Sequence, residues 1–251
     1  MTTADEIIRT LESMRNERQA AHLMRFFKTG KGDYGEGDCF LGLKCPQTRT
    51  VVKEARLDVP LSEIESLLYS PWHEVRLAGF LLLVEEMKAA LPRRKEPTVT
   101  KAERRKEIAT FYIDHAEQAN NWDLVDLTCP KILGEWLLYP SDNGSMPDRA
   151  ILDTLIADRC LWKQRIGIVT TWRLIKERQF DDTLRLAVKL LPHRHDLIHK
   201  AVGWMLREVG KKDIDALTDF LEMHYGVMPR TALRYAIEKM DERTRLYWLH
   251  R

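Results

Sequence analysis

The apolar side chains of HEVRLAGFLLLVEEM (residues 73–87) recur every three to four positions, as Val75, Ala78, Leu82 and Leu83 show. This period matches the turn of an α-helix and predicts a buried helix. The same period recurs in five further segments, at residues 102–116, 122–138, 161–177, 196–211 and 230–240. No segment alternates apolar and polar residues between turn signals, as a half-buried strand would. The sequence therefore predicts an all-α fold.

Helix-breaking clusters separate these segments, at residues 91–100, 139–148, 191–195 and 224–229. The helix that opens at Trp122 has a good start signal. Asn120 or Asn121 can cap it, and Asp123 is favourable in its first turn because the helix dipole is positive there.

The helices look like repeats. Trp122, Trp162 and Trp204 are spaced by 40 and 42 residues, within the range of about 40–47 residues that HEAT-like helical pairs show. A base followed closely by a small residue recurs in similar phase, at Arg76-Leu-Ala78, Arg165-Ile-Gly167, Lys200-Ala201 and Arg230-Thr-Ala232. We expect the small residues to let helices approach closely and the bases to point along the open face of the array. These features predict a single HEAT-like solenoid domain over residues 1–251.

Composition limits the class of protein. The chain has 251 residues, 44% of them apolar, and a net charge of +2. It has no apolar run near the roughly 18–20 residues of a membrane span, and its N-terminus lacks a signal-peptide core. The four cysteines form no CxxC pair, which fits a reducing compartment. We expect a cytoplasmic, monomeric protein without disulfides or a membrane anchor.

Charge is distributed unevenly along the chain. Residues 159–251 carry 19 Lys and Arg against 12 Asp and Glu, whereas residues 1–158 carry 21 against 26. A basic half on a nearly neutral chain suggests a surface for a polyanion, although an ordinary solvated helical surface would have the same composition.

Two helix faces combine aromatic and charged residues. Trp122 and Asp126 are four residues apart and share a face, which suits a planar cation because the ring offers cation–π attraction and the carboxylate offers charge. A core tryptophan beside a salt-bridging aspartate is the alternative. Lys200, Trp204 and Arg207 form one stripe that suits phosphates with a base or sugar between them. Lys163, Arg165 and Arg173 form a similar basic set, and side chains snorkelling over an apolar seam are the alternative for both sets.

Two other motifs are less specific. The glycine-rich segment KTGKGDYGEGDCF (28–40) lacks the ending of a Walker loop. It is either a flexible loop offering Tyr34 to a ligand or a simple connector. His193, His195 and His199 have no Cys or acidic ligand at a recognised spacing, so we expect no metal site.

Four of these segments together resemble the AlkD-type DNA glycosylases, a HEAT-like family that excises alkylated bases. FLGLKCPQTR (40–49) is similar to the family's Phe-Leu-Gly…Pro…Arg segment, and NWDLVD (121–126) to its Trp-Asp-x-Val-Asp motif. LWKQRIGI (161–168) resembles its Trp-x-x-Arg segment, and HKAVGWMLRE (199–208) its Lys-Ala-x-Gly-Trp-x-Leu-Arg-Glu segment. The resemblance covers about residues 20–240, in order, and departs from the family in a longer 28–38 loop.

The resemblance implies a function. Trp122, Asp126 and Trp204 match the family's catalytic positions, and Arg165 and Arg207 match DNA contacts. The expected activity is hydrolysis of the N-glycosidic bond of cationic N3- or N7-alkylated purines in duplex DNA, without a metal or organic cofactor. The expected DNA surface is a basic concave face, to which further residues contribute: Lys200, Lys163, Arg173, Arg230 and Tyr34. The alternatives are a non-catalytic HEAT-like DNA-binding module and a protein-interaction scaffold.

Overall fold

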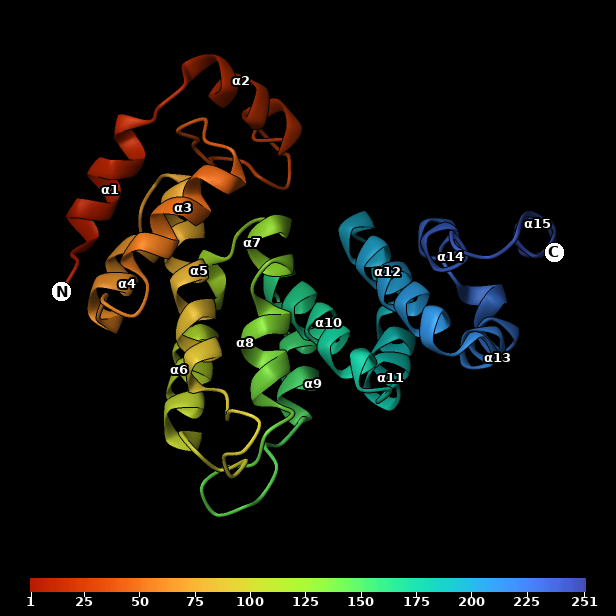
Figure 1. Cartoon of the computed structure of the whole chain (residues 1–251). Coiled ribbons are helices and arrows are strands. Elements are labelled where there is room, and N and C mark those ends of the chain that lie inside the picture. The colour runs from red at the N-terminus through yellow and green to blue at the C-terminus, as the bar shows by residue number, and fades with distance from the viewer. The chain divides into compact units, whose positions relative to one another are not determined.

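The computed structural model describes all 251 residues, and the regular structure is helical throughout (Figure 1). The predicted all-α class is therefore confirmed. The chain packs into two compact units. Unit 1 comprises Met1–Ile132 and Tyr139–Ser145, and unit 2 comprises Leu133–Leu138 and Met146–Arg251. The expectation of one domain over residues 1–251 stays a prediction.

The helices of unit 1 are α1 (Ala4–Ser13), α2 (Glu17–Phe26), α3 (Cys45–Ala55), α4 (Leu61–Leu68), α5 (His73–Ala90), α6 (Ala102–Asp114), the short 3₁₀ helix η1 (Ala116–Gln118) and α7 (Trp122–Asp126). The division between the units lies within α8 (Cys129–Trp136). The helices of unit 2 are α9 (Ala150–Ala157), α10 (Leu161–Lys176), α11 (Asp181–Leu190), α12 (Asp196–Lys212), α13 (Ile214–His224), the 3₁₀ helix η2 (Tyr225–Val227), α14 (Arg230–Ala236) and α15 (Glu242–His250).

Unit 1 is built around α5. This helix packs against α1, α3, α4, α6 and α7, and every residue from His73 to Val84 is buried. The periodic apolar residues predicted to form its core face lie in the interior. Neighbours on every side explain why the apolar residues of α5 extend beyond one stripe.

Unit 2 is a stack of helices. The α10 helix packs on α9 and α12, and α12 packs on α14. Two of the small residues expected at these contacts, Gly167 and Ala232, lie where helices approach closely. A Cβ at Gly167 would lie 2.6 Å from Cγ2 of Ile156 in α9. The carbonyl oxygen of Ala232 in α14 would lie 2.4 Å from a Cβ at Gly203, a glycine of α12 that the sequence pattern did not single out. The predicted helical-repeat arrangement is thus confirmed, together with the close approach at small residues.

One predicted helix is divided in two. The segment 122–138 forms α7 and α8, with a turn at residues 127 and 128 between them. Pro130 explains the break, because proline has no N–H to donate to the carbonyl of Asp126. At the turn between the two helices, the Thr128 hydroxyl donates to the carbonyl of Leu124 at 2.5 Å. The predicted helix 230–240 is also shorter than expected, because residues 237–240 form a turn closed by the Met240 N–H on the Ile237 carbonyl at 3.0 Å.

Two of the bases beside the small residues do not lie on an open face. Arg76 and Arg165 are only 4% and 5% exposed. The prediction that these two side chains point outward is wrong, because each has hydrogen-bond acceptors inside its unit that offset the cost of burying a charge. No helix of the chain combines the length and the apolar character needed to cross a bilayer.

Candidate functional site

Trp122 opens α7 and lies at the edge of an aromatic cluster in unit 1. The Asn121 side-chain oxygen caps the helix by accepting the Trp122 N–H at 2.9 Å, as one of the two predicted caps would. The half-buried indole stacks on Phe27, with ring centroids 5.3 Å apart, and meets Phe26 edge-on at 6.1 Å. Part of its surface is packed and part is open, and its expected role as a catalytic aromatic stays a prediction.

The aromatic cluster continues inward as a stack. Phe27 stacks on Phe40 at 5.1 Å between centroids, and Phe40 stacks on the imidazole of His73 at 4.4 Å. Phe27 and Phe40 are buried, and they form an apolar cluster with Ala20 on which Trp122 packs. Because the stack is several rings deep, it restricts the orientation of its outermost ring, the Trp122 indole.

A buried ion-pair network holds α7 to α5. The Nδ1 of His73 lies 2.7 Å from Oδ2 of Asp38, and its Nε2 lies 3.0 Å from Oδ2 of Asp123. Two carboxylate partners require a ring that donates from both nitrogens, which only the imidazolium can do. Burial opposes the charged form, but Asp123 and Asp38 outweigh it and raise the pKa of His73 to about 9.

Asp38 is the centre of this network. Its Oδ1 accepts from the Arg76 guanidinium at 2.5 Å, and the Asn121 amide donates at 3.2 Å to Oδ2, the oxygen that His73 contacts. Burial raises the pKa of the Asp38 carboxyl, but His73, Arg76 and Asn121 together lower it below its ordinary value. Asn121 therefore connects two functions, because its oxygen caps α7 while its amide nitrogen holds Asp38.

The glycine-rich segment supplies Asp38, which explains its role in unit 1. A Cβ at Gly35 would lie 2.6 Å from the carbonyl oxygen of Phe27, so the loop folds back tightly on α2. The segment therefore does more than connect two helices. Tyr34 is half-buried in this loop, and its expected contact with DNA stays a prediction.

The neighbouring FLGLK segment is held by Glu74. Its two carboxylate oxygens accept the backbone N–H groups of Leu41, Gly42 and Leu43 at 2.8–3.0 Å. Gly42 has a φ of +91°, and a Cβ there would lie 2.0 Å from the Asn16 carbonyl oxygen, so this position requires glycine. The motif noted in the sequence thus has a structural role beside the aromatic stack.

Asp126 lies one turn after Trp122, on the same face of α7, and is half-buried. Its charge acts on the interior as well. Burial raises the pKa of the Tyr112 hydroxyl well above its ordinary value, and the negative charge of Asp126 contributes to the shift. The Tyr112 oxygen lies 3.1 Å from the Thr128 hydroxyl, at the turn that ends α7.

Trp204 and the predicted DNA-contacting bases belong to unit 2, with Trp204 half-buried on α12. Convergence of Trp204 with Trp122 and Asp126 stays a prediction. Buried Arg165 donates to the carbonyl of Leu197 at 2.6 Å, and its contact with DNA also remains a prediction. Exposed Arg230 donates to the Leu249 carbonyl at 2.8 Å.

The other bases of unit 2 have acidic neighbours. Lys200 pairs with Asp196 at 2.9 Å and Lys163 with Asp158 at 3.4 Å. Arg173 lies 2.7 Å from Glu135 and 2.6 Å from Glu177, and Arg207 pairs with Glu238. A phosphate at these positions would have to compete with a carboxylate.

The three clustered histidines have protein partners. His195 accepts the Leu197 N–H at 3.2 Å and so caps α12. His193 lies 3.0 Å from the Gln164 side-chain oxygen, and His199 lies 2.5 Å from the His193 carbonyl oxygen. Burial lowers the pKa of both His193 and His195.

The sequence analysis did not find the ion-pair network. The signal lay in His73, Glu74 and Arg76, three ionisable residues at the start of a helix that is otherwise apolar. Charged groups on an interior helix require partners, but their spacing does not say where in the chain those partners are.

Comparison with known proteins agrees with the fold. The sequence model of a family described as DNA alkylation repair enzyme matches residues 7–240. A solved structure titled as a predicted DNA alkylation repair enzyme from Enterococcus faecalis has a TM-score of 0.64 and 18% identity, and the match covers 91% of this chain and 97% of that one. No functionally curated protein matched. The family match extends over nearly the whole chain, and the protein therefore belongs to the DNA alkylation repair enzyme family.

Proposed function

We propose that the protein is a DNA glycosylase that hydrolyses the N-glycosidic bond of N3- or N7-alkylated purines in duplex DNA. The observation that carries the proposal is the placement of Trp122 and Asp126 on one face of α7. Family membership makes alkylation repair the context. The partly open indole and the half-buried carboxylate one turn away supply what a cationic lesion needs.

The chemistry follows from the charge of the lesion. Alkylation at N3 or N7 gives the purine a positive charge, which weakens the bond to the sugar. As the base departs, positive charge develops on the sugar. Asp126 stabilises this charge and orients the attacking water, while Trp122 and Trp204 offer aromatic faces to it. A neutral purine carries no such charge, so selectivity follows without a tight base pocket.

The ion-pair network supports this proposal through pre-organisation. A charge stabilises a transition state best when its position is already fixed before the reaction. Asn121 caps the first turn of α7, and Asp123 is tied to His73. The five-residue helix that carries both Trp122 and Asp126 is thus fixed at its start.

The bases of unit 2 are proposed to hold the DNA backbone, with Arg207 and Lys200 flanking Trp204 on α12 and Lys163, Arg165, Arg173 and Arg230 on α10 and α14. Exchange of the carboxylate partners of Lys163, Arg173, Lys200 and Arg207 for phosphates would give affinity that falls with salt. Tyr34 is proposed to contact DNA from unit 1.

The experiment is to incubate the protein with duplex DNA methylated at purine N3 and N7 and to identify the released bases by chromatography. Release of free 3-methyladenine or 7-methylguanine, with unmodified bases retained, is expected. Binding without release of any base would replace the glycosylase by a DNA-binding module. Absence of salt-dependent DNA binding would favour a protein-interaction scaffold.

A further inference from the structure

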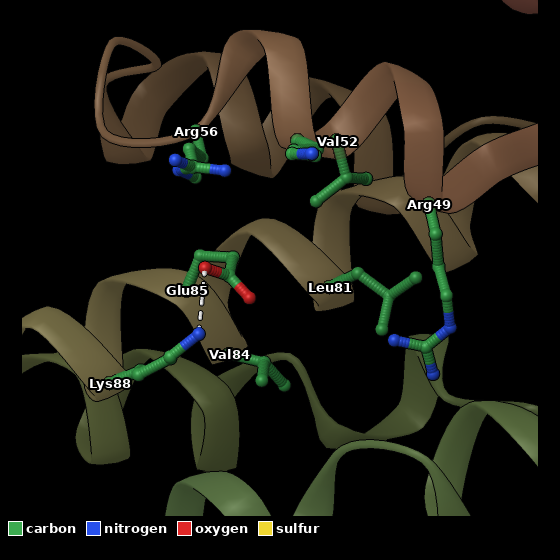
Figure 2. Close-up of a pocket in the computed structure, with 8 residues that line it drawn as sticks. Arg49, Val52, Arg56, Leu81, Val84, Glu85 and Lys88 are labelled. Atoms are coloured by element: carbon green, nitrogen blue, oxygen red, sulfur yellow. Dashed lines mark ion pairs between the residues drawn. The ribbon is translucent and has the colours of Figure 1, made fainter. Parts of the chain in front are cut away.

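Unit 1 contains a groove between α3 and α5 that the proposed function does not use. Its volume is about 290 Å³. Figure 2 shows Arg49 of α3 and Arg56, which directly follows α3, on one side and Glu85 and Lys88 of α5 on the other. The remaining lining residues are Val52, Lys53, Leu81 and Val84. We call this feature the α3–α5 groove.

The three bases on α3 and at its end are free to bind a ligand. Arg49, Lys53 and Arg56 are exposed, and none of them forms a side-chain hydrogen bond or an ion pair within the protein. The single acid of the groove, Glu85, lies 3.7 Å from Lys88. This contrasts with Arg173 and Arg207 in unit 2, whose guanidinium groups already contact carboxylates.

Like charges crowd at one end of the groove. Burial lowers the pKa of Lys131 on α8, and the nearby positive charge of Arg49 lowers it further. An anion bound between such groups would relieve their repulsion.

The basic surface extends past the groove. A second hollow of about 490 Å³ shares Arg56, Glu85 and Lys88 with it and adds Arg93 and Lys101. Together the two hollows contain six bases and one acid, in the part of the chain where acids outnumber bases overall. Counting charges along the sequence conceals this concentration.

We propose that the α3–α5 groove binds backbone phosphates of duplex DNA. Arg49 and Lys53 are four residues apart and share a face of α3, and Arg56 directly follows the last residue of this helix. We call these three bases the stripe. The stripe is about 10 Å long at about 1.5 Å per residue. One DNA strand presents a phosphate for about every 3.4 Å of duplex axis, so the stripe matches about three phosphates of one strand. Arginine favours this ligand because its planar donors fit phosphate oxygens.

The groove is also within reach of DNA held at α7. His73, which binds α7 through Asp123, opens the same helix that lines the groove from Leu81 to Lys88. These positions are about 12–22 Å along α5 from His73, or roughly four to six base pairs of duplex. The choice of DNA over another polyanion rests on the proposed function. The presence of a basic groove is independent of that function.

The test compares two triple variants. R49A/K53A/R56A removes the stripe. R9A/R18A/K106A removes three exposed bases of unit 1 that likewise have no partner and lie outside both hollows. Binding of each to an unmodified 25-base-pair duplex is measured by fluorescence anisotropy across a salt series, with thermal melting to check folding. The groove variant should lose at least tenfold in affinity and have a salt slope shallower by about 2–3 units, at about 0.9 per contact. The control should retain most of both.

The outcomes separate this inference from the proposed function. A groove variant with wild-type affinity and slope would overturn the inference, even where the wild type releases methylated bases. An equal loss in both triple variants would overturn it too, because general charge would then explain binding. If the wild type released no base but the groove variant still lost duplex binding selectively, the proposed glycosylase activity would be wrong. The inference that the groove binds phosphates would stand.

Discussion

The Nε2 of His73 lies 3.0 Å from Oδ2 of Asp123, the residue that follows Trp122 in α7. The same imidazole contacts Asp38 through Nδ1 and stacks on Phe40. One buried side chain thus joins the glycine-rich loop, the central helix of unit 1 and the helix of the proposed site. A very short helix gains little from its own hydrogen bonds, so these contacts account for most of the order of α7.

Removal of this side chain should be costly. His73→Ala leaves the buried carboxylate of Asp38 and the half-buried carboxylate of Asp123 without their shared cation. Loss of one partner of a buried ion pair typically costs about 3–5 kcal/mol. Urea unfolding should show a loss of that size. The control is His22→Ala, because His22 is exposed and has no partner, and its effect should stay within about 0.5 kcal/mol. Equal stability of the two variants would contradict the role of the network.

The network should also make stability depend on pH. The pKa of His73 is raised from 6.5 to about 9, so the folded protein holds this proton more tightly than the unfolded chain does. Its contribution is complete below pH 6.5 and is lost as the pH rises through 9. The difference corresponds to roughly 3 kcal/mol, at about 1.4 kcal/mol per pKa unit.

The measurement is the free energy of unfolding between pH 6 and pH 10, for wild type and for His73→Gln. Glutamine carries no charge at any of these values, so the difference between the two proteins isolates His73 from lysine, tyrosine and cysteine titration. The two curves should converge toward high pH. A constant gap across the range would mean that the imidazole is not charged in the folded protein.

The fold was predictable from the sequence where it depends on local periodicity. The apolar period located α5, α10 and α12, because helices in a packed interior need apolar residues every three to four positions. The break between α7 and α8 has a local cause, Pro130, which the apolar period conceals. The orientation of Arg76 and Arg165 was not predictable, because it depends on acceptors elsewhere in the fold.

The candidate site divides in the same way. Trp122 and Asp126 were found because four-residue spacing places them on one helix face. Asn121 and Asp123 were found as local features of the helix start, but the pairing of His73 with Asp38 and Asp123 was not found, because these carboxylates lie 35 and 50 positions from His73. Only tertiary structure brings such separated groups together. The α3–α5 groove was missed for a related reason, since its bases belong to residues 1–158, where acids outnumber bases overall.

The two partners of the ion pair between Arg207 and Glu238 should have opposite effects on DNA binding when each is replaced. Arg207→Ala should weaken binding to methylated and unmodified duplex alike and reduce the salt slope by about 0.9. Glu238→Ala should strengthen binding, because it frees the guanidinium and removes a charge that repels phosphate. The control is Glu222→Ala, which breaks the ion pair with Arg251, a residue with no proposed DNA contact. Anisotropy titrations that show an unchanged slope for Arg207→Ala would rule out its phosphate contact.

Asp126→Asn tests the chemistry itself. Asparagine has nearly the shape of aspartate, so the variant should keep α7 and the Trp122 stack while losing the negative charge. That charge matters most as positive charge develops on the sugar, and loss of one pre-organised interaction of this kind typically costs on the order of 10²–10³ in rate. Duplex affinity should change little and should not fall, because the lost carboxylate repels phosphates and holds none of them.

The measurement is the single-turnover release of 7-methylguanine, in which slow product release cannot hide the chemical step. Asp126→Asn should be at least tenfold slower than wild type at saturating protein. Asp219→Asn makes the same substitution at an exposed position of α13 and should match the wild-type rate. If Asp126→Asn released the base as fast as this control, the carboxylate would have no part in catalysis. A loss of duplex binding as large as the loss of rate would instead assign Asp126 to DNA binding.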